Sequence, residues 1–174
     1  MERLTARALR IELLLLDVDG VLTDGGIVYA DSGVELKRFH VRDGSGLKLW
    51  QQAGKRAAII SGRKSAAVER RAQELGVDLV FQGREDKLAA FEEVLGRTGF
   101  AAEQVCALGD DLPDLPILAR CGLAVAVADA CPEVQEACHY VTRVAGGQGA
   151  VREAVEWLLK QQGHWDRAVG QFRT

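Results

Sequence analysis

The chain has 174 residues, which is enough for one domain with a sizeable hydrophobic core. Hydrophobic residues make up 48% of it and charged residues 27%, and the formal net charge is −3, as in an ordinary globular protein. No basic stripe is present for nucleic acid to bind, and no apolar run exceeds about six residues, far short of a membrane span. We therefore expect no nucleic-acid partner and no membrane segment.

The N-terminal segment and the cysteines both bear on the cellular compartment. Residues 1–10 are charged and lack the long apolar region and the cleavage site of a signal peptide. The four cysteines form no CxxC pair and lie among small apolar residues, and the three histidines are too scattered to complete a zinc site. We predict a cytoplasmic protein with reduced core thiols at Cys106, Cys121, Cys131 and Cys138.

Apolar runs alternate along the chain with segments of helical spacing. The runs predict strands at residues 13–16, 57–60, 77–81, 105–108, 123–127 and 139–141. The helical segments are residues 46–54, 63–76, 85–99, 112–122, 131–138 and 149–162, and several of them end at a glycine. This alternation predicts an α/β fold, a Rossmann-like three-layer sandwich around a mostly parallel central sheet.

One segment departs from this alternation. Residues 26–41 contain two β-rich arms around the turn sequence DSG, so they predict a β-hairpin that protrudes just after the first strand. The C-terminal part, residues 149–174, is predicted to hold the last helix and then a loosely ordered tail after residue 162. No linker or repeat divides the chain, so we expect a single domain over residues 1–174.

Polar side chains follow the predicted strands at the carboxyl edge of the sheet, where open α/β sheets bind their ligands. The first strand is followed by Asp17 and Asp19, the second ends in Ser61-Gly62-Arg63, and the fourth is followed by Asp110, Asp111 and Asp114. Lys87 lies shortly after the third strand. Taken singly, each acid or hydroxyl is more often a helix cap and the lysine a solvated surface residue.

Their convergence on one edge changes that interpretation. Several carboxylates on one edge repel one another unless a cation lies among them, and Mg²⁺ prefers a few carboxylates together with water and a phosphate. Hydroxyl, backbone N–H and lysine groups suit the phosphate oxygens. The sequence therefore predicts a magnesium and phosphate site.

The residues that carry this site also resemble a known superfamily. The stretch DVDGVLT (residues 17–23) resembles the DxDGxxT signature of the haloacid dehalogenase superfamily of phosphatases, and Ser61, Lys87 and GDDLPD (residues 109–114) match its other three motifs in order. The resemblance implies that Asp17 is the nucleophile that forms an aspartyl phosphate and that Asp19 is the general acid and base.

The same resemblance implies roles for the remaining motif residues. Asp17, Asp110 and the backbone carbonyl of Asp19 are expected to bind the metal, with Asp111 orienting the metal shell and Asp114 supporting Lys87 or its loop. Ser61, Gly62, Arg63 and Lys87 are expected to hold the phosphate or the substrate.

The spacing of the motifs limits what can cover this site. Only 42 positions separate Asp19 from Ser61, and only 26 separate Ser61 from Lys87. The hairpin, single helices and strands occupy both intervals, so no room is left for the cap domain that many members of the superfamily carry. The sequence therefore predicts the capless branch, in which the hairpin and a neighbouring subunit close the site.

Longer stretches resemble one capless family, the 3-deoxy-D-manno-octulosonate 8-phosphate phosphatases. They include LLLLDVDGVLTDGGIVY, FHVRDGSGLKLWQQAG, IISGR and GGQGAVREAVEWLL. The resemblance implies a homotetramer with shared active sites, in which Arg42, Asp43 and Gly44 lie near the sugar acid of an adjacent subunit. A hairpin exit and a helix cap remain the alternative for these three residues.

Three other functions stay open at this point. A related group dephosphorylates nine-carbon, sialic-acid-like 9-phosphates; Arg63 favours the octulosonate branch because arginine is typical there and glutamate of the nine-carbon branch. A receiver-type signalling module also combines clustered acids, a hydroxyl and a lysine, but its phosphorylated aspartate follows the third strand, which here ends in FQG. An inactive oligomerisation domain would not need the complete set of motif residues.

Overall fold

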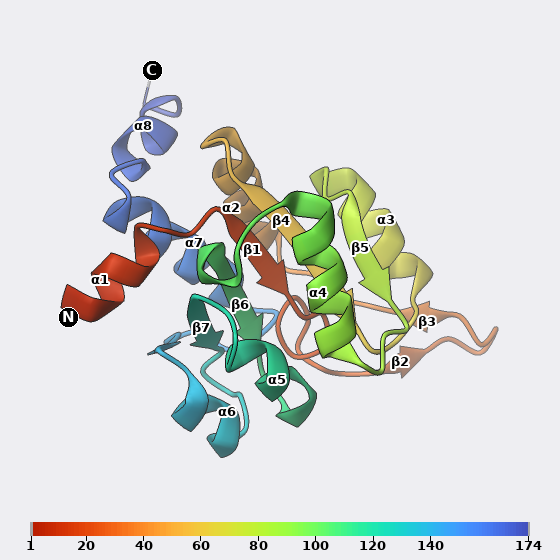
Figure 1. Cartoon of the computed structure of the whole chain (residues 1–174). Helices are drawn as coiled ribbons and strands as arrows, with labels where there is room; N and C mark the ends of the chain where they lie inside the picture. Colours follow the sequence, from red (N-terminus) through yellow and green to blue (C-terminus); the bar gives the residue numbers. More distant parts are fainter. Residues whose placement is uncertain (1, 174) are drawn as a thin grey trace.

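The computed structural model describes residues 2–173 as a six-stranded sheet between two layers of helices (Figure 1). All the pairings in this sheet are parallel, in the order β5-β4-β1-β6-β7-β8. The strands are β1 (Leu13–Leu16), β4 (Arg56–Ser61), β5 (Leu79–Gln82), β6 (Val105–Gly109), β7 (Leu123–Ala126) and β8 (Tyr140–Val141). The predicted three-layer α/β fold is confirmed, with strand ends that differ by one or two residues.

The helices divide between the two faces of the sheet. Contacts join α2 (Val41–Gln52) to α3 (Ala66–Leu75) and to α7 (Ala150–Gln161) on one face. On the other face α4 (Lys87–Thr98), α5 (Leu115–Leu118) and α6 (Pro132–Ala137) follow one another, and they lie in front of the sheet in Figure 1. Because both faces are covered, the strands can be apolar throughout, and all four leucines of β1 are buried.

The hairpin is present at the predicted place. It consists of β2 (Val28–Tyr29) and β3 (Glu35–Leu36), which pair antiparallel and project from the carboxyl edge of the sheet (Figure 1). Between β1 and β4 the chain forms only this hairpin and α2, and between β4 and α4 only α3 and β5. Neither interval within the described chain holds a cap domain.

The two ends of the described chain form helices that the sequence pattern did not predict. These are α1 (Glu2–Ala8) and α8 (Trp165–Gly170), and short 3₁₀ turns occur at Ala102–Gln104 and Leu112–Asp114. The expectation of a loosely ordered tail was wrong, because Trp165 is half-buried and lies against the cations of Arg152 (5.3 Å) and Lys160 (5.4 Å).

The cysteines and the helix lengths were the other features that the composition addressed. All four cysteines are free thiols, two of them buried. No helix in residues 2–173 combines the length and the apolar character that a bilayer crossing requires.

Candidate active site

The sheet order brings the motif residues to one edge. Strand β1 lies between β4 and β6, and all three run in the same direction. Asp17 follows the end of β1, Ser61 ends β4 and Asp110 follows β6. Their placement on one edge, which the sequence predicted, follows from three adjacent parallel strands, an order that the sequence did not specify.

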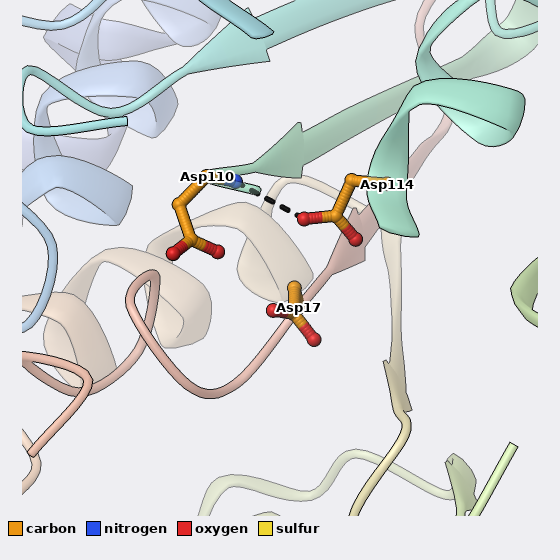
Figure 2. Close-up of side chains that lie close together, drawn as sticks. All are labelled: Asp17, Asp110 and Asp114. Carbon is orange, nitrogen blue, oxygen red and sulfur yellow. Dashed lines mark hydrogen bonds between the residues drawn. The ribbon is translucent and has the colours of Figure 1, made fainter. Parts of the chain in front are cut away.

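Three carboxylates form the centre of the site. Figure 2 shows Asp17, Asp110 and Asp114 facing a common space, and one oxygen from each lies within 4.8 Å of the others. The backbone N–H of Asp110 donates to Asp114 Oδ2 at 3.1 Å, which fixes the turn that carries both acids. Oxygen Oδ1 of Asp110 is buried without a hydrogen-bond partner in the described chain, as expected of an atom that binds a cation.

A glycine allows this arrangement. Gly20 has a φ of +91°, and a Cβ atom there would lie 1.9 Å from Asp110 Oδ2. Any side chain at this position would therefore displace the carboxylate of Asp110 and strain the backbone. The glycine of the DVDG stretch is thus required by the close approach of the loop to the acid cluster.

Lys87 supplies positive charge to the cluster. Its Nζ lies 2.8 Å from Asp17 Oδ1 and 2.7 Å from Asp114 Oδ1, and its side chain is 9% exposed. Burial alone would lower the pKa of Lys87, but the charges of Asp17 and Asp114 outweigh it and raise that pKa. The predicted support of Lys87 by Asp114 agrees with this contact.

The acids themselves are shifted toward their protonated forms. Burial, helped by the charge of Asp114, raises the pKa of Asp17 to about 6. Burial and the charges of Asp17 and Asp114 raise the pKa of Asp110 to about 8. One lysine thus does not balance the carboxylates, and a divalent cation between Asp17 and Asp110 fits this donor set.

The loop after β4 lies beside these acids. Ser61 is buried, and its Oγ accepts a hydrogen bond from the backbone N–H of Arg63 at 3.2 Å. Gly62 has only the backbone oxygen of Arg84 near its missing Cβ, at 3.9 Å, so the loop is open at this point. The side chain of Arg63 is 42% exposed and reaches Glu35 Oε2 at 2.5 Å.

Two hairpin residues that sequence reasoning missed complete the surroundings of Asp19. The ammonium group of Lys37 forms an ion pair with Asp19 and lies 3.3 Å from Glu35 Oε1, and Nε of Arg63 lies 3.9 Å from Asp19 Oδ2. Residues 35 and 37 are two positions apart in a β arm and so share a face. Two opposite charges on one face of a β arm, beside the predicted catalytic edge, were the sequence signal that could have identified Glu35 and Lys37.

Asp111 and two residues at the start of α2, Asp43 and Gly44, do not belong to the acid cluster. Asp111 is exposed and lies outside the group of three carboxylates. Asp43 is 1% exposed, and its Oδ1 accepts from the N–H of Arg152 at the start of α7, while Gly44 is buried beside Arg71. Asp43 therefore binds the start of α7 and does not cap α2, whose N-cap residue His40 makes no side-chain cap hydrogen bond.

Arg42 alone of that segment offers its side chain to solvent. It lines a surface cavity of about 300 Å³ together with Arg143 and Gln148. No hydrogen bond or ion pair within residues 2–173 joins Arg42, Asp43 or Gly44 to the acid cluster. Their expected role in an adjacent subunit's site stays a prediction.

The parallel sheet and the acid cluster together define a hydrolase of the haloacid dehalogenase type. The family model for haloacid dehalogenase-like hydrolases matches residues 79–154. The 3-deoxy-D-manno-octulosonate 8-phosphate phosphatase KdsC of Escherichia coli K12 is 49% identical over 166 residues, which are 95% of this chain and 88% of the relative.

Solved structures agree with this relation. A probable YrbI family phosphatase from Pseudomonas syringae has a TM-score of 0.97 and 46% identity, over 100% of this chain and 99% of that one. The octulosonate 8-phosphate phosphatase of Moraxella catarrhalis, solved with magnesium, phosphate and KDO, has a TM-score of 0.96 and 41% identity over 99% of both chains. The chain therefore belongs to the 3-deoxy-D-manno-octulosonate 8-phosphate phosphatase family of the haloacid dehalogenase superfamily.

Proposed function

We propose that this protein is a magnesium-dependent phosphatase that hydrolyses 3-deoxy-D-manno-octulosonate 8-phosphate to the free sugar acid and phosphate. The observation that carries the proposal is the cluster of Asp17, Asp110 and Asp114, with its unpartnered oxygen and with Lys87 alongside. The magnesium, phosphate and KDO bound by the Moraxella relative, 41% identical over nearly the whole chain, support the same substrate class here.

In the proposed first step, Asp17 attacks the phosphorus atom. A bond forms between its carboxylate oxygen and phosphorus, the bond from phosphorus to the sugar oxygen breaks, and Asp19 gives its proton to that leaving oxygen. Lys87 and the hydroxyl of Ser61 hold the phosphate oxygens during the transfer. Asp17 must be ionised to attack, and its raised pKa shows that burial opposes this state.

In the second step, water releases the phosphate. Asp19, now ionised, accepts a proton from the water as its oxygen attacks phosphorus, and the bond to Asp17 breaks. Mg²⁺, when held by Asp17, Asp110 and the backbone carbonyl of Asp19, would offset the negative charge of the phosphate and the acids. Asp111 is proposed to orient water in the metal shell and Asp114 to hold Lys87.

We also propose a homo-oligomer, a tetramer with shared active sites. Six of the ten large exposed apolar side chains in the described chain lie within residues 27–41, on and beside the hairpin. A monomer would leave these side chains in water, and large exposed apolar side chains gathered in one segment are typical of protein interfaces. The segment also adjoins the site, so a neighbouring hairpin or the Arg42 segment can close it. A cytoplasmic location stays a prediction.

The substrate proposal is tested by turnover of two sugar-acid phosphates side by side. With Mg²⁺ present, octulosonate 8-phosphate should have a higher kcat/KM than a nine-carbon sugar-acid 9-phosphate, and a chelator should abolish both activities. A preference for the nine-carbon ester would support the second candidate, against which Arg63 argues. No phosphate release from either would contradict the proposed function.

The assembly proposal is tested by sedimentation. The purified protein should sediment as a species of about four times the 18.9 kDa chain, and an Ile27→Asp change in the apolar segment at residues 27–41 should shift it toward smaller species. A monomer at micromolar concentration would contradict the shared-site proposal.

A further inference from the structure

Four charged side chains form a closed ring beside the acid cluster. Lys37 pairs with Asp19 and lies 3.3 Å from Glu35; Arg63 reaches Glu35 at 2.5 Å and Asp19 at 3.9 Å. Each cation therefore contacts both acids, and the ring carries no net charge when both acids are ionised. Lys37 bonds Oδ1 of Asp19, which leaves Oδ2 as the oxygen that can carry the transferred proton. It joins the loop after β1, the loop after β4 and the second arm of the hairpin, which are far apart in the sequence.

Within the ring, Lys37 is the residue that holds Asp19. The carboxylate of Asp19 follows the buried strand β1 but points out of the core, with its side chain 22% exposed. Lys37 is its hydrogen-bond donor, and no other donor to it occurs within residues 2–173. The side chain of Lys37 is 1% exposed, so its ammonium group stays between the two acids and is withdrawn from solvent.

We propose that Lys37 is a positioning residue, which holds the carboxylate of Asp19 at the reacting side of the site while Glu35 keeps Lys37 in place. This inference rests on the proposed function, because it assigns Lys37 a part in the proton transfer by Asp19. The hairpin then acts within its own protomer as part of the machinery, in addition to providing apolar surface.

The test separates proton transfer from other losses by the choice of ester. An alkyl phosphate such as octulosonate 8-phosphate needs a proton on its leaving oxygen, whereas p-nitrophenyl phosphate has a leaving group stable as an anion. The change is Lys37→Met, which keeps the stem and removes the charge. We expect kcat/KM to fall about tenfold to a hundredfold for the alkyl ester, because a misplaced acid loses most of its effect, and less than about threefold for the aryl ester.

The control is Arg38→Met in the same hairpin arm. Arg38 also forms an ion pair, with Asp24, but its side chain is 76% exposed and lies outside the ring. This variant should keep both activities, and Lys37→Arg should restore the ratio between the two esters. If Lys37→Met does not assemble, Lys37→Gln repeats the comparison with an amide in place of the charge.

The outcomes distinguish this inference from the proposed function. Wild-type protein that releases phosphate from neither ester would remove the basis of both. Wild-type turnover with equal losses on the two esters in Lys37→Met, or with a gain, would overturn the role of Lys37 alone. A crystal structure of Lys37→Met should show the Asp19 carboxylate turned from its wild-type direction, and an unmoved carboxylate would overturn the inference.

Discussion

Replacing Lys87 by methionine should destabilise the protein in a way that depends on pH. The change removes an ammonium group that lies 2.8 Å from Asp17 and 2.7 Å from Asp114. With an effective dielectric constant of about 20, each contact corresponds to roughly 6 kcal/mol of gross attraction. Desolvation of the lysine offsets much of this, so we expect a net loss of about 3–5 kcal/mol, as for a broken buried ion pair.

Thermal unfolding at matched protein concentration measures this loss. For a chain of this size, 1 kcal/mol corresponds to roughly 2–4 °C, so Tm should fall by about 6–20 °C at pH 8–9. The raised pKa values of Asp17 and Asp110 mean that the folded state takes up protons on acidification. Protonation relieves the unpaired charge, and the deficit should therefore shrink as the pH falls toward 5.

Two further measurements make this prediction specific. Mg²⁺ should restore part of the Tm of Lys87→Met, since a cation among the acids replaces some of the lost charge. Lys48→Met, which changes an exposed lysine of α2, should leave Tm nearly unchanged. A drop of equal size at pH 5 and pH 9 would show that lost packing, and not lost charge, is responsible.

Two further changes and one pH profile probe the acid cluster. Asp17→Asn should lower kcat by about a thousandfold or more with the fold and assembly intact, and near-full turnover would exclude Asp17 as the nucleophile. Gly20→Ala should weaken Mg²⁺ binding about 10–100-fold in calorimetry, because the added Cβ collides with Asp110. Gly33→Ala is the matched control, because Gly33 has a similar φ of +79° but no atom within 4 Å of the added Cβ; it should leave Mg²⁺ binding unchanged. The Mg²⁺ affinity of the wild type should rise from pH 6 to pH 8, and binding should release protons, because the raised pKa of Asp110 makes the metal compete with a proton. An Mg²⁺ affinity that does not change with pH would contradict the raised pKa of Asp110.

Much of the fold and the centre of the site could be predicted because they depend on local patterns. The leucines at 13–16 are followed directly by Asp17, and the run at 105–108 is followed by Gly109 and then Asp110. Both runs lie in strands buried on two faces. Parallel strands place their carboxyl ends on one edge, and Asp17 and Asp110 meet there because β1 and β6 are neighbours in the sheet. The interval lengths likewise left no room for a cap domain.

The rest depends on contacts between distant segments. Asp43 lies at the start of α2, but the N–H that it accepts belongs to Arg152 of α7, which no local pattern reveals. The pairing of Lys37 with Asp19 requires the hairpin to return over the edge of the sheet. Helix α8 is held in part by the ring of Trp165 against Arg152 and Lys160 of α7, and its own sequence has little periodicity.

The most direct test of the account is to trap the phosphoryl group on Asp17. Asp19→Asn is mixed with p-nitrophenyl phosphate and Mg²⁺ and then quenched in acid. It should release a burst of p-nitrophenolate and retain a phosphoryl group on the protein. The p-nitrophenolate group leaves with little proton transfer, whereas hydrolysis of the aspartyl phosphate needs Asp19 as the base. Peptide mass spectrometry should locate the group on Asp17, and Asp17→Asn should carry none. Release of p-nitrophenolate without protein-bound phosphate, or a phosphoryl group on another residue, would contradict the account.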